Sequence, residues 1–112
     1  MKIDARHEQG ATILVPKGKI TIGEGDVALR GAVREALDAG SERIVVDLGQ
    51  VTTMDSSGVG ELVSAFTTVK NRGGRLALAN LPTKVVDILQ ITQLITVLDV
   101  HDSVDEALAS FG

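Results

Sequence analysis

The stretch TTMDSSGVGEL, residues 52–62, joins two segments whose apolar residues follow different patterns. Before it, RIVVDL at residues 43–48 is nearly continuous and apolar, as is typical of a buried strand. After it, apolar residues recur at helical spacing as far as position 69. The acid Asp55, the hydroxyls of Ser56 and Ser57, and two glycines therefore stand where a strand passes into a helix.

The two serines do not form a recognisable catalytic nucleophile. A nucleophile elbow needs Gly-x-Ser-x-Gly, but Met54 stands two positions before Ser56, and Asp55 stands two positions before Ser57. The chain has only two histidines that could act as a base, and they lie far apart in the sequence. No carboxylate and histidine residues have metal-ligand spacing, so we expect neither an enzyme nor a metal or cofactor site.

A second glycine pattern, GEGDVA at residues 23–28, resembles a phosphate-binding loop. It matches Gly-x-Gly-x-x-Ala, and Asp47 follows about twenty residues later, as in dinucleotide-binding folds. However, Glu24 and Asp26 would repel a pyrophosphate at this place. We therefore favour a plain loop in which Asp26 is the N-cap of the next helix.

The motif around Asp55 has a structural and a regulatory interpretation. Asp55, Ser56 or Ser57 could each cap the helix that follows, but one cap does not explain three polar residues and two glycines. Glycine lowers helix stability, so Gly58 and Gly60 suggest that another surface approaches closely. A serine at a helix N-terminus can also take a phosphate, which adds about −1.5 to −2 charge without opposing the helix dipole.

Composition limits the class of protein. The 112 residues fit one domain, 1–112, with an aliphatic core and only two aromatic side chains. The net charge is −4 and basic residues are scattered, so direct nucleic-acid binding has no support. The absence of cysteine, of a signal-like N-terminus and of a long apolar run leads us to expect a cytoplasmic protein without membrane contact.

The remaining pattern predicts alternating strands and helices. Strands are expected over residues 2–8 and 11–18, joined by a hairpin turn and followed by extended chain to residue 22, and later over residues 43–48, 75–79 and 96–99. Four helices are expected: from Asp26 to Gly40, from the opening motif to residue 71, from Pro82 through Leu89, and from a capping box at residues 103–106 through Phe111. This order predicts an α/β fold with a small mixed β-sheet.

Several stretches together resemble one known family. They are VVDL and MDSSGVG within residues 45–60, KNRGGRL at 70–76, VVDIL at 85–89 with Leu94, and GKI at 18–20. These stretches are similar to the signature of the STAS domain family, the bacterial anti-sigma factor antagonists, over essentially the whole chain. The resemblance implies a small sheet with helices packed mainly on one side.

The resemblance also implies a mechanism of partner switching. An unphosphorylated antagonist of this family binds an anti-sigma factor that is also a serine kinase, and so releases the sigma factor. The kinase then phosphorylates the serine after the motif aspartate, here Ser56, and a phosphatase resets it. Partner-binding residues expected from the resemblance are Thr21, Asp55, Ser56, Ser57, Gly58 and Gly60.

One position departs from the family pattern. Many antagonists have an aspartate where this chain has Thr21, so Thr21, Glu24 or Asp26 are expected to set a different partner preference. Two alternatives stay open: a constitutive interaction module without phosphorylation, and a small-ligand or nucleotide sensor. Ile91, Leu94 and Ile95 could serve the former, although ordinary core positions are the favoured interpretation. We expect a monomer, or a weak homodimer through a strand edge.

Overall fold

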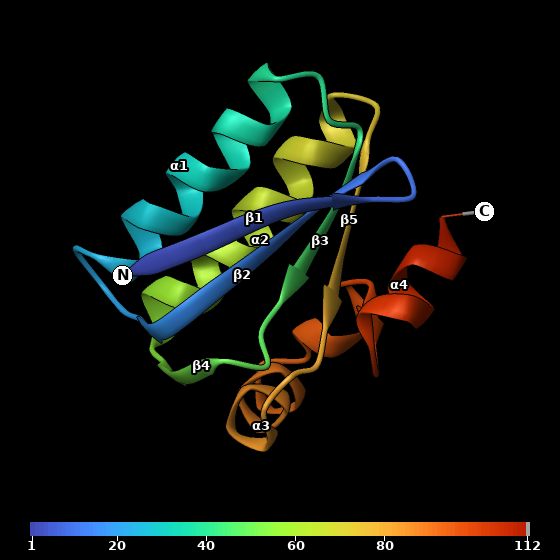
Figure 1. The fold of residues 1–112 in the computed structure, drawn as a ribbon. Helices are drawn as coiled ribbons and strands as arrows, with labels where there is room; N and C mark the ends of the chain where they lie inside the picture. The colour runs from blue at the N-terminus through green and yellow to red at the C-terminus, as the bar shows by residue number, and fades with distance from the viewer. Residues whose placement is uncertain (112) are drawn as a thin grey trace.

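Residues 1–111 form a six-stranded mixed sheet with four α-helices and one 3₁₀-helix (Figure 1). The structure, a computed structural model, describes residues 1–111. The strand order is β1-β2-β3-β5-β6, and β4 pairs with β2 outside this path; β1 and β2 are antiparallel, and the other pairs are parallel. The elements are β1 (Lys2–Glu8), β2 (Ala11–Ile20), α1 (Gly25–Asp38), β3 (Arg43–Asp47), β4 (Val51–Met54), α2 (Ser56–Asn71), β5 (Arg75–Ala79), α3 (Thr83–Ile91), η1 (Leu94–Thr96), β6 (Val100–His101) and α4 (Val104–Ser110).

The helices divide unequally between the two faces of the sheet. One core cluster joins α1, α2 and α3 to alternate residues of the central strands, such as Leu14, Ile44 and Leu78. A smaller cluster joins α4 to the intervening residues, such as Ile13 and Val45. Because side chains alternate along a strand, β3 and β5 are buried on both faces, which accounts for their unbroken apolar sequence. The predicted α/β class, with helices mainly on one side, is confirmed.

The strand β2 changes partner partway along its length. Besides its antiparallel ladder with β1, it pairs in parallel with β3 over Thr12–Leu14 and then, from Gly18 with φ +105°, with the short strand β4. Ile20 thereby lies opposite Met54, directly before the motif. The strand β4 was not predicted from the sequence, because it has only four residues and two of them are threonines. This switch carries the end of β2 to the start of α2.

The predicted last strand at residues 96–99 is wrong. Gln93 adopts left-handed backbone geometry, φ 62°, and η1 follows, with the N–H groups of Val97 and Leu98 both donating to the Leu94 carbonyl. Val97 is consequently half exposed rather than a sheet residue. The last strand is instead β6, only two residues long, because the chain meets β5 only after this turn.

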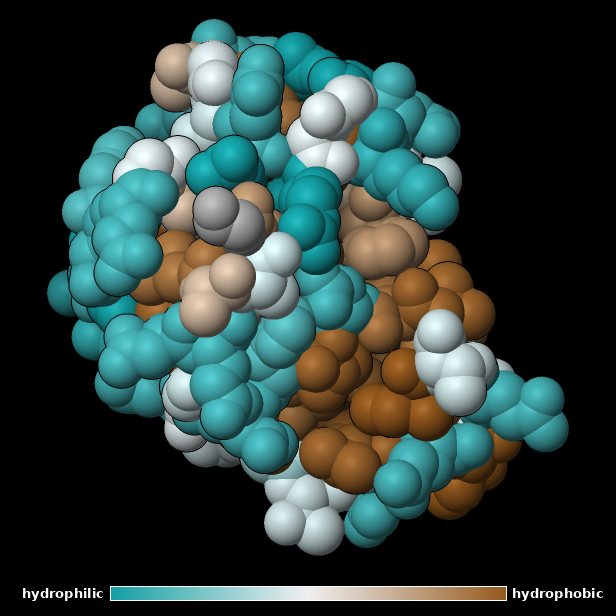
Figure 2. Space-filling model, turned by 90° about the vertical axis from the view of Figure 1, so that its right-hand side faces the viewer, coloured by the Kyte–Doolittle hydropathy of each residue, from teal (hydrophilic) through white to brown (hydrophobic). Residues whose placement is uncertain are grey.

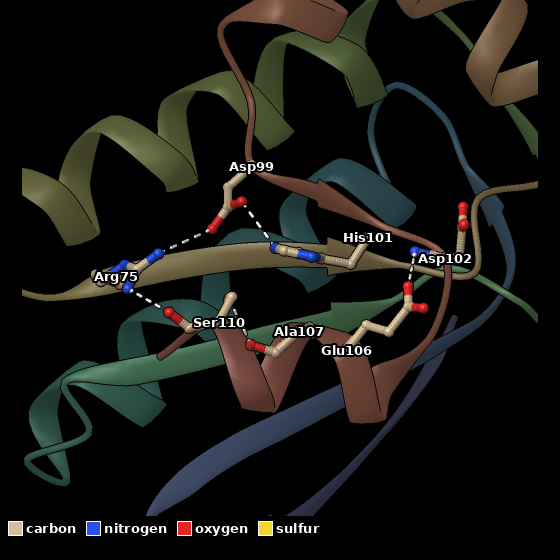
Figure 3. A network of polar contacts seen from close by, with 7 residues as sticks. All are labelled: Arg75, Asp99, His101, Asp102, Glu106, Ala107 and Ser110. Atoms are coloured by element: carbon tan, nitrogen blue, oxygen red, sulfur yellow. Dashed lines mark hydrogen bonds and ion pairs between the residues drawn. The ribbon is translucent and has the colours of Figure 1, made fainter. Parts of the chain in front are cut away.

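The C-terminal helix α4 is held on its face by a polar network (Figure 3). Arg75 donates to the Ser110 carbonyl at 2.9 Å and lies 5.2 Å from the centre of the Phe111 ring. Asp99 lies between Arg75, at 3.4 Å, and the ring nitrogen Nε2 of His101, at 2.8 Å. The predicted cap is present, since Ser103 Oγ accepts from the Glu106 N–H at 3.1 Å. Glu106 in turn accepts from the backbone N–H of Asp102 at 3.3 Å, one residue before the N-cap.

Candidate functional site

Asp55 organises the start of α2. It is the N-cap residue, and its Oδ1 accepts from the Gly58 N–H at 3.0 Å. Its Oδ2 accepts from the Ile22 N–H, also at 3.0 Å, so the same carboxylate holds the loop after β2. Of the three residues that could cap this helix by type, Asp55 is the one that does so. The hydroxyls of Ser56 and Ser57 are therefore released from capping.

These backbone contacts also fix the charge of Asp55. Backbone N–H groups, that of Gly58 first and then that of Ile22, lower the pKa of the Asp55 carboxyl below its ordinary value. The carboxylate is thus ionised at neutral pH and cannot rotate away without losing both bonds. It presents a fixed negative charge directly beside Ser56.

The two serines differ in exposure. Ser56 is the first residue of α2 and is exposed, while Ser57 is half-buried. Among the hydrogen bonds within residues 1–111, none involves the Ser56 hydroxyl, so no internal contact explains its presence there. Capping preference by residue type did not separate these two hydroxyls, but the family resemblance singled out Ser56, and in the structure Ser56 is the more exposed of the two.

The two glycines of the motif are not equivalent. A Cβ on Gly58 would meet the carbonyl oxygen of Ile20 and would lie 2.6 Å from the Met54 Cγ. Gly58 is therefore explained by close internal packing of α2 on β2, without a partner. A Cβ on Gly60 would meet nothing within 4 Å, and Gly60 is exposed. Gly60 is the glycine whose missing side chain keeps the outer surface flat.

The N-termini of α1 and α2 meet at the end of β2. A Cβ on Gly25, the first residue of α1, would lie 2.6 Å from the Cα of Ile20, the same residue that Gly58 approaches. On the outer surface here, Ile22 is 74 % exposed and Val27 is 51 % exposed. Sequence reasoning missed both side chains as surface residues. The sequence feature that could have predicted their exposure is that both apolar residues fall outside the helical stripe that faces the core.

The loop from residue 21 to 26 is closed by its own acid. Helix α1 begins at Gly25 with Glu24 as N-cap, so the prediction that Asp26 is the N-cap is wrong. Asp26 is nevertheless buried, and its Oδ1 accepts from the N–H groups of Gly23 at 2.9 Å and Val27 at 2.7 Å. A carboxylate thus occupies the position that a bound phosphate would need, which argues against a dinucleotide site.

The other two residues expected to set partner preference face outward to different degrees. Thr21 is half-buried, and its carbonyl accepts from the Asp26 N–H at 3.2 Å. The Glu24 side chain is 80 % exposed and pairs with the amino group of Met1 at 2.9 Å. Glu24 is therefore the acid on the surface of this loop.

An ion pair behind the site joins α1 to α2. Arg30 contacts the Glu61 carboxylate through two nitrogens, at 3.1 and 3.2 Å, and the Glu61 side chain is only 8 % exposed. Sequence reasoning did not single out this pair, because the two residues belong to different helices. Their contact fixes the relative position of the two helix starts.

The exposed groups around the start of α2 are of the kind that a binding surface presents. In residues 1–111, no three histidine or acidic side chains gather in a group that could hold a metal ion. No helix in that range combines the length and apolar character needed to cross a membrane. What the surface presents is a free serine hydroxyl, a fixed carboxylate, a flat glycine and two exposed apolar side chains.

Comparison with known proteins assigns the domain to a family. The STAS domain model matches residues 2–107, and the chain belongs to the STAS domain family. The Anti-sigma-B factor antagonist of Bacillus subtilis is 36 % identical over 81 residues, which cover 70 % of this chain and 74 % of the relative.

Two solved structures share the fold. A candidate anti-sigma factor antagonist from Thermotoga maritima has a TM-score of 0.88 at 25 % identity, covering 96 % of this chain and 92 % of that one. The Bacillus cell fate determinant SpoIIAA in its phosphorylated form has a TM-score of 0.75 at 18 % identity, covering 99 % of this chain and 100 % of that one. At this lower identity, the similarity to SpoIIAA concerns the fold alone.

Proposed function

We propose that this chain is an anti-sigma factor antagonist that works as a phosphoswitch on Ser56. In the unphosphorylated form, the surface around the start of α2 binds an anti-sigma factor that is also a serine kinase. Phosphorylation of Ser56 by that kinase ends the binding, and a phosphatase restores it. The names of the relatives support the antagonist role, and the site geometry supports the switch.

The observation that carries the proposal is that Asp55 and Ser56 have separate structural positions at the start of α2. Asp55 holds the helix and the loop, while the Ser56 hydroxyl is exposed on the first turn. A phosphate on Ser56 would therefore displace no internal hydrogen bond. SpoIIAA, which has this fold, has been solved in unphosphorylated and phosphorylated forms, so the fold can accommodate a phosphate.

The same geometry explains why a phosphate would end binding. Ile22 donates its N–H to Asp55, the residue before Ser56, so a partner that covers the exposed Ile22 side chain would also remove the Ser56 side chain from water. A phosphate there adds about −1.5 to −2 charge beside the ionised Asp55, and burying that charge without a counter-ion is strongly unfavourable. Binding is lost while the interior of the domain is unchanged.

The test is affinity capture from native cells with wild type, Ser56→Asp, Ser57→Ala and Ser64→Asp as baits. Ser64 is exposed on the same helix, so Ser64→Asp adds the same charge away from the first turn and serves as the matched control. We expect an anti-sigma kinase with every bait except Ser56→Asp, and phosphate on Ser56 of the wild-type bait. A Ser56→Asp bait that retains the partner, or phosphate on Ser57 alone, would overturn the proposal.

A second candidate function is a constitutive interaction module, and the surface of α3 and η1 favours it. Ile91 is 83 % exposed and Val97 is 54 % exposed, while Leu94 and Ile95 are half-buried against the core. The core interpretation therefore holds for Leu94 and Ile95 but fails for Ile91. Figure 2 shows apolar side chains gathered on the lower part of the molecule, where Figure 1 places α3. A partner kept by Ser56→Asp and lost by Ile91→Glu would support this module.

A further inference from the structure

The strand β1 leaves one edge of the sheet open. It is the terminal strand in the order β1-β2-β3-β5-β6, and within residues 1–111 its only ladder is with β2. An edge strand of seven residues presents unpaired backbone N–H and C=O groups, which are a template for pairing with another strand. What this edge can pair with depends on its side chains.

The two faces of β1 differ in character. Lys2, Asp4, Arg6 and Glu8 share one face, since side chains alternate along a strand, and their charges alternate in sign. Each of these four side chains is more than a third exposed. The other face carries Ile3, Ala5 and His7, which lie opposite Pro16, Leu14 and Thr12 of β2.

We propose that this edge pairs with β1 of a second copy of the chain, antiparallel and about a two-fold axis through Ala5. In this register, Lys2 lies opposite Glu8 of the second copy, and Asp4 lies opposite Arg6. Two-fold symmetry repeats both contacts, so all eight charged side chains meet an opposite charge. Opposite charges directly across an antiparallel pair stabilise the pairing.

The same charges exclude the neighbouring registers. A strand edge slips by two residues at a time, because only alternate backbone groups point outward. A slip in one direction places Asp4 opposite Asp4, and a slip in the other places Arg6 opposite Arg6. Charged residues blunt an edge when like charges meet. Here the alternation of charge along β1 disfavours both slipped registers, and only the register centred on Ala5 pairs opposite charges.

The internal ion pairs of β1 do not oppose this arrangement. Asp4 contacts Lys17 at 2.7 Å, and Arg6 contacts Glu8 at 2.7 Å, both at the surface. Exposed pairs of this kind contribute little to stability, so rearranging them for cross-strand partners has a small cost. Asp4 can keep Lys17 while it gains Arg6 of the second copy.

The helices leave room for the pairing. Helix α1 lies over β2 and β1, and a groove of about 300 Å³ between α1 and β1 is lined by Ile3, Ala5 and Ala32, among others. With strands ~4.8 Å apart, the two β2 strands in the dimer would be separated by three spacings, ~14 Å. An α-helix with its side chains is about 10–12 Å wide, so the two α1 helices fit side by side. The two grooves then lie next to each other at the symmetry axis.

The test uses two variants with single-sign edges. Lys2→Glu/Arg6→Glu makes the edge wholly acidic, and Asp4→Lys/Glu8→Lys makes it wholly basic. In sedimentation velocity over a concentration series, we expect wild type to reach twice its mass of 11.7 kDa and each variant alone to stay monomeric. An equimolar mixture of the two variants should dimerise again. The control Arg34→Glu/Lys84→Glu changes exposed charges elsewhere and should dimerise like wild type.

A cysteine at the axis tests the register. The chain has no cysteine, and Ala5 would face Ala5 of the second copy at about 4.5–5.5 Å between Cα atoms, within disulfide range. Ala5→Cys should therefore form a dimer under mild oxidation, whereas Ala109→Cys on α4 should not. A monomeric wild type, dimers that survive in both single-sign variants, or dimers without the Ala5→Cys cross-link would each overturn the proposal. None of these results bears on the Ser56 switch.

Discussion

The two glycines of the motif should respond in opposite ways to the same added methyl group. Gly58→Ala places a Cβ against the Ile20 carbonyl and 2.6 Å from the Met54 Cγ, whereas Gly60→Ala places one in open space. Both residues lie in α2 without a positive φ angle, so alanine is a better helix former than glycine at each position. The comparison therefore isolates the internal contact of Gly58.

The magnitudes follow from two opposing effects. Alanine in place of glycine stabilises a helix interior by up to about 1 kcal/mol. Overpacking costs about 1–3 kcal/mol, and the upper part applies at Gly58 because the obstacle is the backbone at the end of β2. We expect the free energy of unfolding to fall by about 2 kcal/mol for Gly58→Ala and to rise by up to about 1 kcal/mol for Gly60→Ala.

Thermal unfolding followed by circular dichroism measures both effects. An unfolding entropy of about 2.1 cal/mol/K per residue gives ~4 °C per kcal/mol for 112 residues. Gly58→Ala should therefore lower Tm by ~8 °C, and Gly60→Ala should raise it by up to ~4 °C. A Gly58→Ala protein as stable as wild type would refute the reasoning that β2 packs rigidly against α2. A Gly60→Ala protein that is more stable but binds its partner less well would assign Gly60 to the docking surface.

Four further substitutions test other parts of the structure. Asp55→Asn should lower Tm at neutral pH. The pKa of Asp55 is lower in the folded than in the unfolded state, so the ionised carboxylate adds to the free energy of unfolding at a pH above its unfolded-state pKa. This stabilisation is lost as the pH falls through the lower folded-state pKa. The Tm values of wild type and Asp55→Asn should therefore converge in acid. Leu62→Ala, at a fully buried position, should cost about 2–5 kcal/mol in urea unfolding, whereas Ile91→Ala at the surface should stay within about 0.5 kcal/mol. Arg75→Ala removes the bonds to α4 and Asp99 and should cost about 1–2 kcal/mol, with amide exchange accelerated first in α4.

The sequence predicted those features that depend on neighbouring residues. The strand predicted over residues 43–48 and found over Arg43–Asp47, the helix start in the motif and the cap at Ser103 follow from local pattern and chemistry. The assignment of the cap to Asp55 required coordinates, because Ser56 and Ser57 are equally good capping residues by type. The Gly58 N–H decides the matter, since it donates to Asp55 Oδ1, and the second oxygen of the same carboxylate accepts from the Ile22 N–H of the loop.

Other features depended on contacts between distant segments. Gly58 suggested an approaching partner, but the approaching group is Ile20, carried there when β2 changes partner after Gly18. That change involves a four-residue strand whose pattern is too short to recognise. For the same reason, Ile22 and Val27 were not predicted as surface residues. Their exposure follows from the way two helix starts meet at one strand end.

The remaining question about the proposed switch is whether it needs a conformational change. Asp55 is held by N–H groups on both sides, and its lowered pKa keeps it from taking up a proton at neutral pH. Nearby, Asp26 is committed to the loop backbone, and Glu24 is an exposed acid. A phosphate on Ser56 would thus stand beside the fixed carboxylate of Asp55, whose charge is kept at neutral pH. Under the proposed function, the charge alone suffices to repel the partner, and the fold around it serves as a rigid support.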